Sequence, residues 1–101
     1  RRAFISRRVS PKLRRAARVV DPHSGRGLEL FSDQPGMQLY TGNFLDGTVV
    51  GRNGVAYAKR TAFCLEPQGF PDAPNQPDFP NAVLSPGEDY RNTIVYRFFA
   101  E

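Results

Sequence analysis

Tyr90-Arg-Asn-Thr-Ile-Val-Tyr-Arg-Phe-Phe99 is the stretch that most clearly decides the fold of this 101-residue chain. Ile94, Tyr96 and Phe98 recur at every second position, which is the spacing of a β-strand with one strongly apolar face. The preceding Ser85-Pro-Gly-Glu-Asp89 consists of residues typical of turns. The sequence therefore predicts a strand that begins after a tight turn and runs almost to the end of the chain.

Four other stretches repeat this character on a smaller scale. They alternate or are rich in β-forming residues, and Gly- and Pro-containing turns separate them: 16–20, 27–31, 37–41 and 61–66. The turn Asp21-Pro-His-Ser-Gly-Arg26 separates the first two, and His23 within it is expected to be an exposed turn residue. Because no stretch of useful length has helical periodicity, we expect an all-β protein, an antiparallel β-sandwich in preference to a barrel.

The charge of the chain is divided unevenly. Residues 1–18 hold eight of the fourteen basic residues and no acid, whereas residues 19–101 hold all ten acids. We expect residues 1–18 to form a basic, flexible leader and residues 19–101 to form the folded domain. The acidic balance of that domain argues against nucleic acid as a partner.

Cysteine and histidine are scarce, which limits the chemistry available. One cysteine, Cys64, and one histidine, His23, leave no ligand set for zinc, so we expect no metal and no cofactor. A single cysteine cannot form an internal disulfide, and neither a secretory signal nor a membrane-spanning apolar run is visible. We therefore expect a cytoplasmic protein without a membrane partner.

Glu66 is the first candidate for a catalytic role. It closes the predicted strand 61–66, where Pro67 is expected to end the strand pairing, and a long proline-rich loop follows. Alternation places Glu66 on the same face as the small residues Ala62 and Cys64, which leaves room for a ligand. A carboxylate in this position can act as a general base, although a solvated surface charge is the alternative.

Gln38 and Tyr40 are the second candidate pair. In the predicted strand 37–41 they share one face, and the apolar Met37 and Leu39 share the other. An amide beside a phenol offers both donors and acceptors to a polyhydroxylated ligand. A polar pair on a solvent-facing strand is the alternative.

Several blocks taken together resemble a known family. They are Asp21-Pro-His-Ser-Gly-Arg26, Pro35-Gly-Met-Gln-Leu-Tyr-Thr-Gly-Asn-Phe-Leu-Asp-Gly-Thr48, Phe63-Cys-Leu-Glu-Pro-Gln-Gly-Phe-Pro-Asp-Ala-Pro-Asn75, Phe79-Pro80, Val83-Leu-Ser-Pro-Gly-Glu88 and Tyr96-Arg-Phe98. In this order, from about Leu13 to Phe98, they resemble the C-terminal part of aldose 1-epimerase, the galactose mutarotase family. The resemblance implies the supersandwich fold of that family.

The resemblance also implies an activity. Mutarotases are isomerases that interconvert the α and β anomers of free aldoses such as galactose and glucose by acid–base ring opening, without a metal or organic cofactor. Glu66 matches the family's general base in its Leu-Glu-x-Gln setting, and Gln38 matches the sugar-binding glutamine of the Pro-Gly-x-Gln block. A role for Tyr40 in substrate binding is inferred only from the face it shares with Gln38.

Other parts of the family's site have no counterpart in this sequence. The family's acid is a histidine, assisted by a second histidine and an aspartate, and His23 lies in a distant turn. We therefore expect a truncated chain that is inactive alone, or, as the alternative, a non-catalytic carbohydrate-binding or structural remnant. A partial sandwich would also leave open sheet edges, through which self-association is expected.

Overall fold

A computed structural model describes residues 2–5 and 12–101 of the chain. Its strands are β1 (Arg2–Ile5), β2 (Arg14–Val20), β3 (Arg26–Ser32), β4 (Gly36–Tyr40), β5 (Cys64–Gln68) and β6 (Ile94–Ala100). Within the described residues, the only helical segments are two single turns of 3-10 helix, Arg52–Gly54 and Ala73–Asn75. The prediction of an all-β chain is confirmed.

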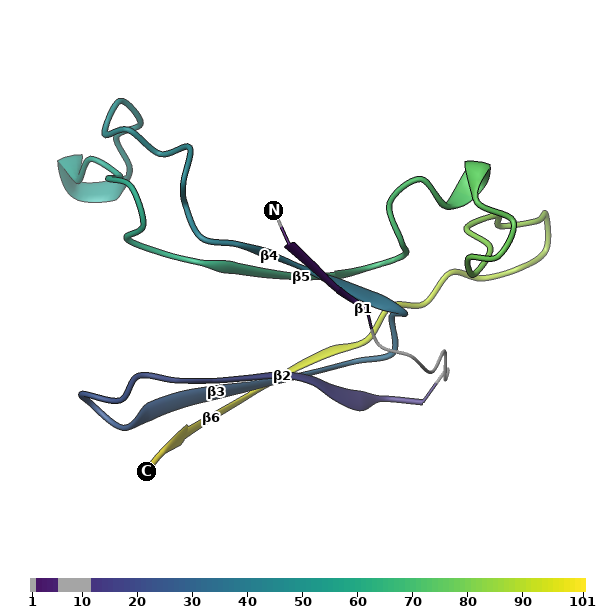
Figure 1. Cartoon of the computed structure of the whole chain (residues 1–101), viewed down its shortest axis with the longest axis horizontal. Helices are drawn as coiled ribbons and strands as arrows, with labels where there is room; N and C mark the ends of the chain where they lie inside the picture. The colour runs from purple at the N-terminus through teal and green to yellow at the C-terminus, as the bar shows by residue number, and fades with distance from the viewer. Residues whose placement is uncertain (1, 6–11) are drawn as a thin grey trace.

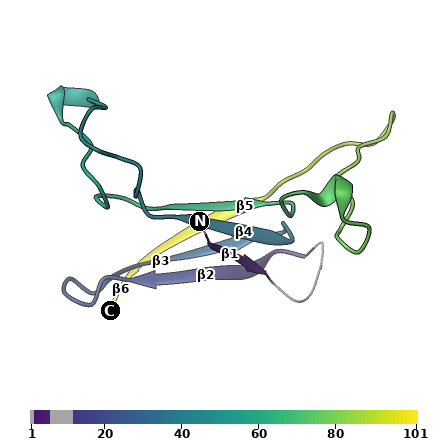
Figure 2. The same ribbon diagram turned by 45° about the horizontal axis from the view of Figure 1, so that its top comes forward.

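The strands form two three-stranded antiparallel sheets, which we name by their central strands. The β4 sheet has the order β1-β4-β5, and the β3 sheet has the order β2-β3-β6. The sheets lie one above the other, and the short link from β3 to β4 carries the chain between them (Figures 1 and 2). This arrangement is the antiparallel β-sandwich that the sequence predicted.

The core lies between the two sheets and is small. Leu30, at the centre of β3, is completely buried, and Met37 of β4 is 6% exposed. Side chains from both sheets line a shared apolar space of about 310 Å³, among them Ala17, Val19, Met37, Leu39 and Leu65. The alternation along β4 and β5 therefore directs Met37, Leu39 and Leu65 inward and leaves the intervening residues on the outer face of the β4 sheet.

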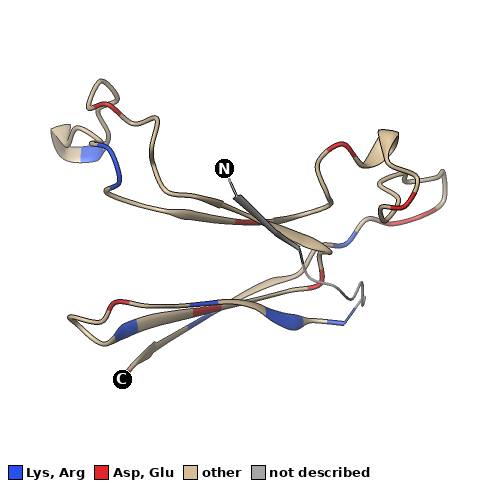
Figure 3. Ribbon diagram, viewed as in Figure 1, with Lys and Arg blue, Asp and Glu red and all other residues tan. Residues whose placement is uncertain are grey.

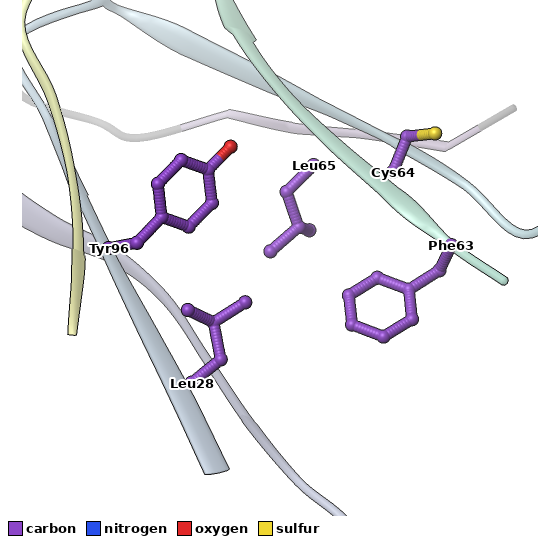
Figure 4. Close-up of a pocket in the computed structure, with 5 residues that line it drawn as sticks. All are labelled: Leu28, Phe63, Cys64, Leu65 and Tyr96. Atoms are coloured by element: carbon purple, nitrogen blue, oxygen red, sulfur yellow. The ribbon is translucent and has the colours of Figure 1, made fainter. Parts of the chain in front are cut away.

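One flank of this core is open. Tyr96 and Phe98 of β6 are 52% and 77% exposed, and Leu28, Phe63, Leu65 and Tyr96 surround a space of about 330 Å³ between the sheets (Figure 4). The two sheets thus leave part of their facing surfaces uncovered.

Part of residues 1–18, the stretch expected to form a flexible leader, lies in strands of the structure. Arg2–Ile5 forms β1, and the predicted boundary between residues 18 and 19 falls inside β2; residues 6–11 lie outside the described part of the chain. Arg14 donates to the carbonyl oxygens of Ser32 and Gln34 at 3.3 and 2.7 Å, and Arg15 pairs with Glu29. Arginines enter the strand because backbone carbonyls accept hydrogen bonds from Arg14 and the Glu29 carboxylate neutralises Arg15.

Pro67 does not end the pairing of its strand, contrary to the prediction. β5 begins at Cys64 and continues to Gln68, with Pro67 opposite Met37 in the antiparallel register. β5 is the last strand in the order of the β4 sheet. An edge strand tolerates proline because one side of its backbone needs no ladder donor.

Two long loops frame the outer face of the β4 sheet. Residues 41–63 and 69–93 leave opposite ends of β4 and β5 and extend away from the β3 sheet (Figures 1 and 2). The second loop is held at its end, where the Thr93 backbone N–H donates to both carboxylate oxygens of Asp33 at 3.2 Å. This contact fixes the start of β6 at Ile94, later than the sequence suggested.

Candidate functional site

Gln38 and Glu66 lie side by side on the outer face of the β4 sheet. They are Cα partners in the antiparallel register of β4 and β5, so their side chains leave the sheet on the same side. Gln38 is only 9% exposed, whereas Glu66 is exposed. The structure therefore joins the two strongest sequence candidates, which are 28 positions apart in the chain, in one site.

Glu66 is available to a ligand. Among the side chains that the structure describes, it has neither an ion-pair nor a hydrogen-bond partner. Strands β4 and β5 carry no Lys or Arg, whereas basic residues recur along the strands of the β3 sheet (Figure 3). An exposed carboxylate without a fixed cation can accept a proton or a hydrogen bond from a bound hydroxyl.

Gln68 is a member of the site that sequence reasoning missed. Its side-chain amide Nε2 donates to Oε1 of Gln38 at 3.4 Å, from the position two residues beyond Glu66 on the same face of β5. The period-2 spacing of Glu66 and Gln68 was the available signal. That spacing places Gln68 on the face of Glu66, whereas its contact with Gln38 follows from the register of β4 and β5.

Tyr40 lies on the same strand as Gln38, opposite Cys64 in the register. Its hydroxyl oxygen accepts a hydrogen bond from the Phe44 backbone N–H at 3.3 Å, and the two rings stack with centroids 6.3 Å apart. The ring therefore holds the beginning of the loop 41–63 against the sheet. A role in substrate binding stays a prediction.

The loop 69–93 is fixed beside the site by aromatic residues. A Cβ atom at Gly36 would lie 2.8 Å from the ring of Phe70, so the ring covers β4 only because position 36 has no side chain. The Phe79 ring meets Phe70 edge-on at 5.2 Å between centroids. This pair forms an aromatic boundary at the Gln68 end of the outer face.

His23 takes no part in this site. It lies exposed in the turn between β2 and β3, where its backbone N–H donates to Asp21 at 3.2 Å. The Ser24 hydroxyl, followed by that N–H, lowers the pKa of Asp21 below its ordinary value. The prediction that His23 is an exposed turn residue is confirmed.

No group of three or more His, Cys, Asp or Glu side chains in residues 2–5 and 12–101 is arranged to hold a metal ion. The same part of the chain contains no helix long and apolar enough to cross a membrane.

These features define a class of protein. It is an antiparallel β-sandwich in which the outer face of one sheet carries an exposed glutamate, Glu66, beside a buried glutamine, Gln38. Residues 4–97 match the model of the family described as aldose 1-epimerase, and the chain belongs to this family of isomerases. The match begins at residue 4, inside the stretch that was expected not to resemble the family. The family assignment made from the sequence is confirmed.

Individual relatives agree with this assignment. The chain is 56% identical over 82 residues to galactose mutarotase of Homo sapiens, an alignment that covers 81% of this chain and 24% of the relative. It is 53% identical over 89 residues to galactose mutarotase of Bos taurus, covering 88% of this chain and 26% of the relative. With aldose 1-epimerase of Escherichia coli (strain K12) the identity is 35% over 101 residues, covering 98% and 29%. The chain thus spans about a quarter of the length of these relatives.

Proposed function

We propose that the outer face of the β4 sheet binds a free aldose such as galactose or glucose, and that Glu66 is the general base of its anomerisation. The observation that carries this proposal is the pairing of an exposed, unpartnered Glu66 with the buried Gln38 across β4 and β5. Membership of the aldose 1-epimerase family supports the choice of substrate class.

The chemistry requires one proton acceptor and one proton donor. The Glu66 carboxylate takes the proton from the anomeric O1–H while the bond between C1 and the ring oxygen breaks and a C1=O aldehyde forms. An acid delivers a proton to the ring oxygen, and C1 rotates before the ring closes on its other face. Gln38 donates to a sugar hydroxyl, and the ring of Tyr40 borders the sugar. No metal is needed for any of these steps.

The acid is the part of this reaction that the chain's own histidine does not supply. His23 lies in the turn of the other sheet, and general acid catalysis contributes roughly 10²- to 10⁴-fold. We therefore propose that the chain alone binds aldoses with little or no turnover. The alternative proposal is a non-catalytic carbohydrate-binding module, in which Glu66 takes no part in proton transfer.

Polarimetry with an external acid separates these alternatives. Fresh α-D-galactose is followed in imidazole buffer near neutral pH, with the wild-type chain, with Glu66→Gln, and with a matched control, Glu101→Gln, whose glutamate follows β6 and pairs with Arg18. We expect the wild type and Glu101→Gln to accelerate mutarotation beyond the same buffer, and Glu66→Gln to lose the increment. Equal rates for wild type and Glu66→Gln would contradict the role of Glu66 as base.

Self-association through an open sheet edge is proposed as well. β6 is the last strand of the β3 sheet, contains no proline, and exposes Tyr96 and Phe98 by 52% and 77%. The edge of β5 is less suited to pairing because Pro67 lacks a donor. We expect oligomers in sedimentation equilibrium that dissociate on Phe98→Lys; a monomeric wild type would contradict this proposal.

A cytoplasmic location is proposed from the state of the one thiol. Cys64 is free and exposed, and in Figure 4 its sulfur points away from the space between the sheets. A reducing compartment preserves such a thiol. Fractionation of cells that express the chain, with thiol labelling of Cys64, tests the proposal, and recovery in a secreted fraction would contradict it.

A further inference from the structure

The contact between Gln68 and Gln38 gives the site a fixed polarity. A glutamine side chain carries one acceptor oxygen and an NH₂ group with two donors, and which of them meets a ligand depends on the neighbouring groups. Here Nε2 of Gln68 donates to Oε1 of Gln38 at 3.4 Å. The Gln38 carbonyl therefore points toward Gln68 and accepts its hydrogen bond, and the Gln38 NH₂ group, which has no partner among the described residues, is left for a ligand.

The backbone register explains why Gln68 can reach Gln38. Gln68 lies opposite Gly36, which has no side chain, and diagonally across from Gln38 on the same face. Phe70 fills the space above Gly36, with its ring Cδ1 2.8 Å from the position a Cβ would occupy. The half-buried Gln68 thus lies between the aromatic boundary of the site and the Gln38 amide.

The polarity suits the carboxylate next to it. Glu66 is an acceptor when ionised, so a ligand hydroxyl that donates to Glu66 keeps its lone pairs free for a donor. The NH₂ group of Gln38 is such a donor, whereas the Gln38 carbonyl would leave two acceptors facing each other around the hydroxyl. An unmatched acceptor of this kind weakens binding.

We propose that Gln68 is a positioning residue that orients the amide of Gln38, so that one sugar hydroxyl donates to Glu66 and accepts from the Gln38 NH₂ group. The inference rests on the proposed function for the identity of the ligand. The orientation itself is a property of the free protein. It is therefore measurable without any sugar.

The first experiment measures that orientation by ¹⁵N relaxation of the Gln38 side-chain NH₂ group in the free chain. The signal is assigned by its loss in Gln38→Leu. We expect an ordered amide in the wild type and an order parameter below about 0.6 in Gln68→Met, which keeps the length of the side chain and removes its donor. Gln76→Met is the control, since Gln76 donates to Asp72 within the loop 69–93, and it should leave Gln38 ordered.

The second experiment titrates galactose into the same variants. Loss of the oriented donor should weaken binding by about threefold to tenfold in Gln68→Met, the range expected for one neutral hydrogen bond. Gln76→Met should bind as the wild type does. Gln68→Glu supplies an acceptor in place of a donor, so the Gln38 NH₂ group should turn toward position 68. Its NMR signals should shift while the group stays ordered. The affinity for galactose should fall at least as much as in Gln68→Met.

The outcomes separate this inference from the proposed function. An equally ordered Gln38 amide in wild type and Gln68→Met overturns the inference, whether or not galactose binds. If the Gln38 amide becomes mobile in Gln68→Met but the wild type binds no galactose, the orientation is supported and the proposed function is contradicted. Unchanged galactose affinity in both Gln68 variants overturns the inference even where Gln38 becomes mobile.

Discussion

Glu29 and Glu66 are two strand glutamates with opposite surroundings. Glu29, on the outer face of the β3 sheet, is 7% exposed and lies within 4 Å of three arginines: Arg15 at 2.8 Å, Arg97 at 3.5 Å and Arg18 at 3.8 Å. Glu66, on the outer face of the β4 sheet, is exposed, and the described side chains offer it no such partner. One carboxylate is held by its neighbours and stabilises the fold, whereas the other is free to meet a ligand.

The same contrast distinguishes the two outer faces. Arg18 of the β3 sheet also stacks on the Phe99 ring at 4.7 Å and pairs with Glu101, so the charges there are joined in one network. The outer face of the β4 sheet instead has an amide pair, Gln38 and Gln68, beside one unpaired charge. Substitutions in the β3 sheet should therefore change stability, and substitutions on the outer face of the β4 sheet should change ligand binding.

The largest stability effect is expected from Leu30→Ala. Leu30 is completely buried at the centre of the β3 sheet, and truncation of a buried leucine costs about 2–5 kcal/mol. Urea denaturation followed by circular dichroism measures the loss. Leu65→Ala is the matched control in the β4 sheet, and because Leu65 is half-buried its loss should be smaller. A larger loss for Leu65→Ala would mean that the core is centred elsewhere.

Glu29→Gln should have the next largest effect. The amide keeps the shape of the side chain but removes the negative charge that three arginines share. Charges left without a partner cost several kcal/mol when they are fully desolvated. The arginine side chains are 41–70% exposed, so water screens them and we expect about 2 kcal/mol, between the values for a buried and an exposed pair. Glu101→Gln removes an exposed charge from the same face and should cost less than about 1 kcal/mol. Equal losses for the two variants would contradict a structural role for Glu29.

Asp33 should contribute a pH-dependent part of the stability. The Thr93 backbone N–H, which donates to its carboxylate, lowers the pKa of Asp33 below its ordinary value. A lowered folded-state pKa stabilises the fold above the unfolded value of about 3.9, and the contribution is lost as the pH falls through the folded pKa. The stability difference between wild type and Asp33→Asn should therefore be largest above about pH 4 and shrink toward pH 2.5. A difference that does not change with pH would contradict this role.

The smallest stability effect is expected from Glu66→Gln. An exposed carboxylate without a described partner contributes within about 0.5 kcal/mol, so its unfolding curve should overlay that of the wild type. The same variant is expected to lose the Glu66-dependent mutarotation in imidazole buffer. A loss of unfolding free energy comparable to that of Glu29→Gln would contradict the distinction between the two glutamates.

The strands, and the face of its strand on which each of Glu66 and Gln38 lies, could be predicted from the sequence because both depend on local alternation. Period-2 spacing indicated the strand that contains Tyr96. It also placed Cys64 and Glu66 on one face of their strand and Leu65 on the other, and in Figure 4 Cys64 and Leu65 point to opposite sides of β5. The Asp21–Arg26 turn followed from its residue types, and the structure closes it by a hydrogen bond from Gly25 N–H to the Asp21 carbonyl.

Features that depend on the neighbouring strand could not be predicted in this way. β2 includes Arg14 and Arg15 because Ser32, Gln34 and Glu29 accept their hydrogen bonds from across the sheet. Pro67 remains in its strand because β5 is at an edge. Gln68 was missed because its role follows from the register of β5 with Gly36 and Gln38 of β4, which the sequence of one strand does not reveal.

The most direct test of the central claim is a titration of the ¹⁵N-labelled chain with D-galactose, followed by backbone amide shifts. We predict saturable shifts at Gln38 and Glu66, with the amides of Glu29 and Arg97 unmoved, and loss of the shifts in Gln38→Leu. Shifts confined to the β3 sheet, or none at saturating sugar, would contradict the assignment of the ligand to the outer face of the β4 sheet.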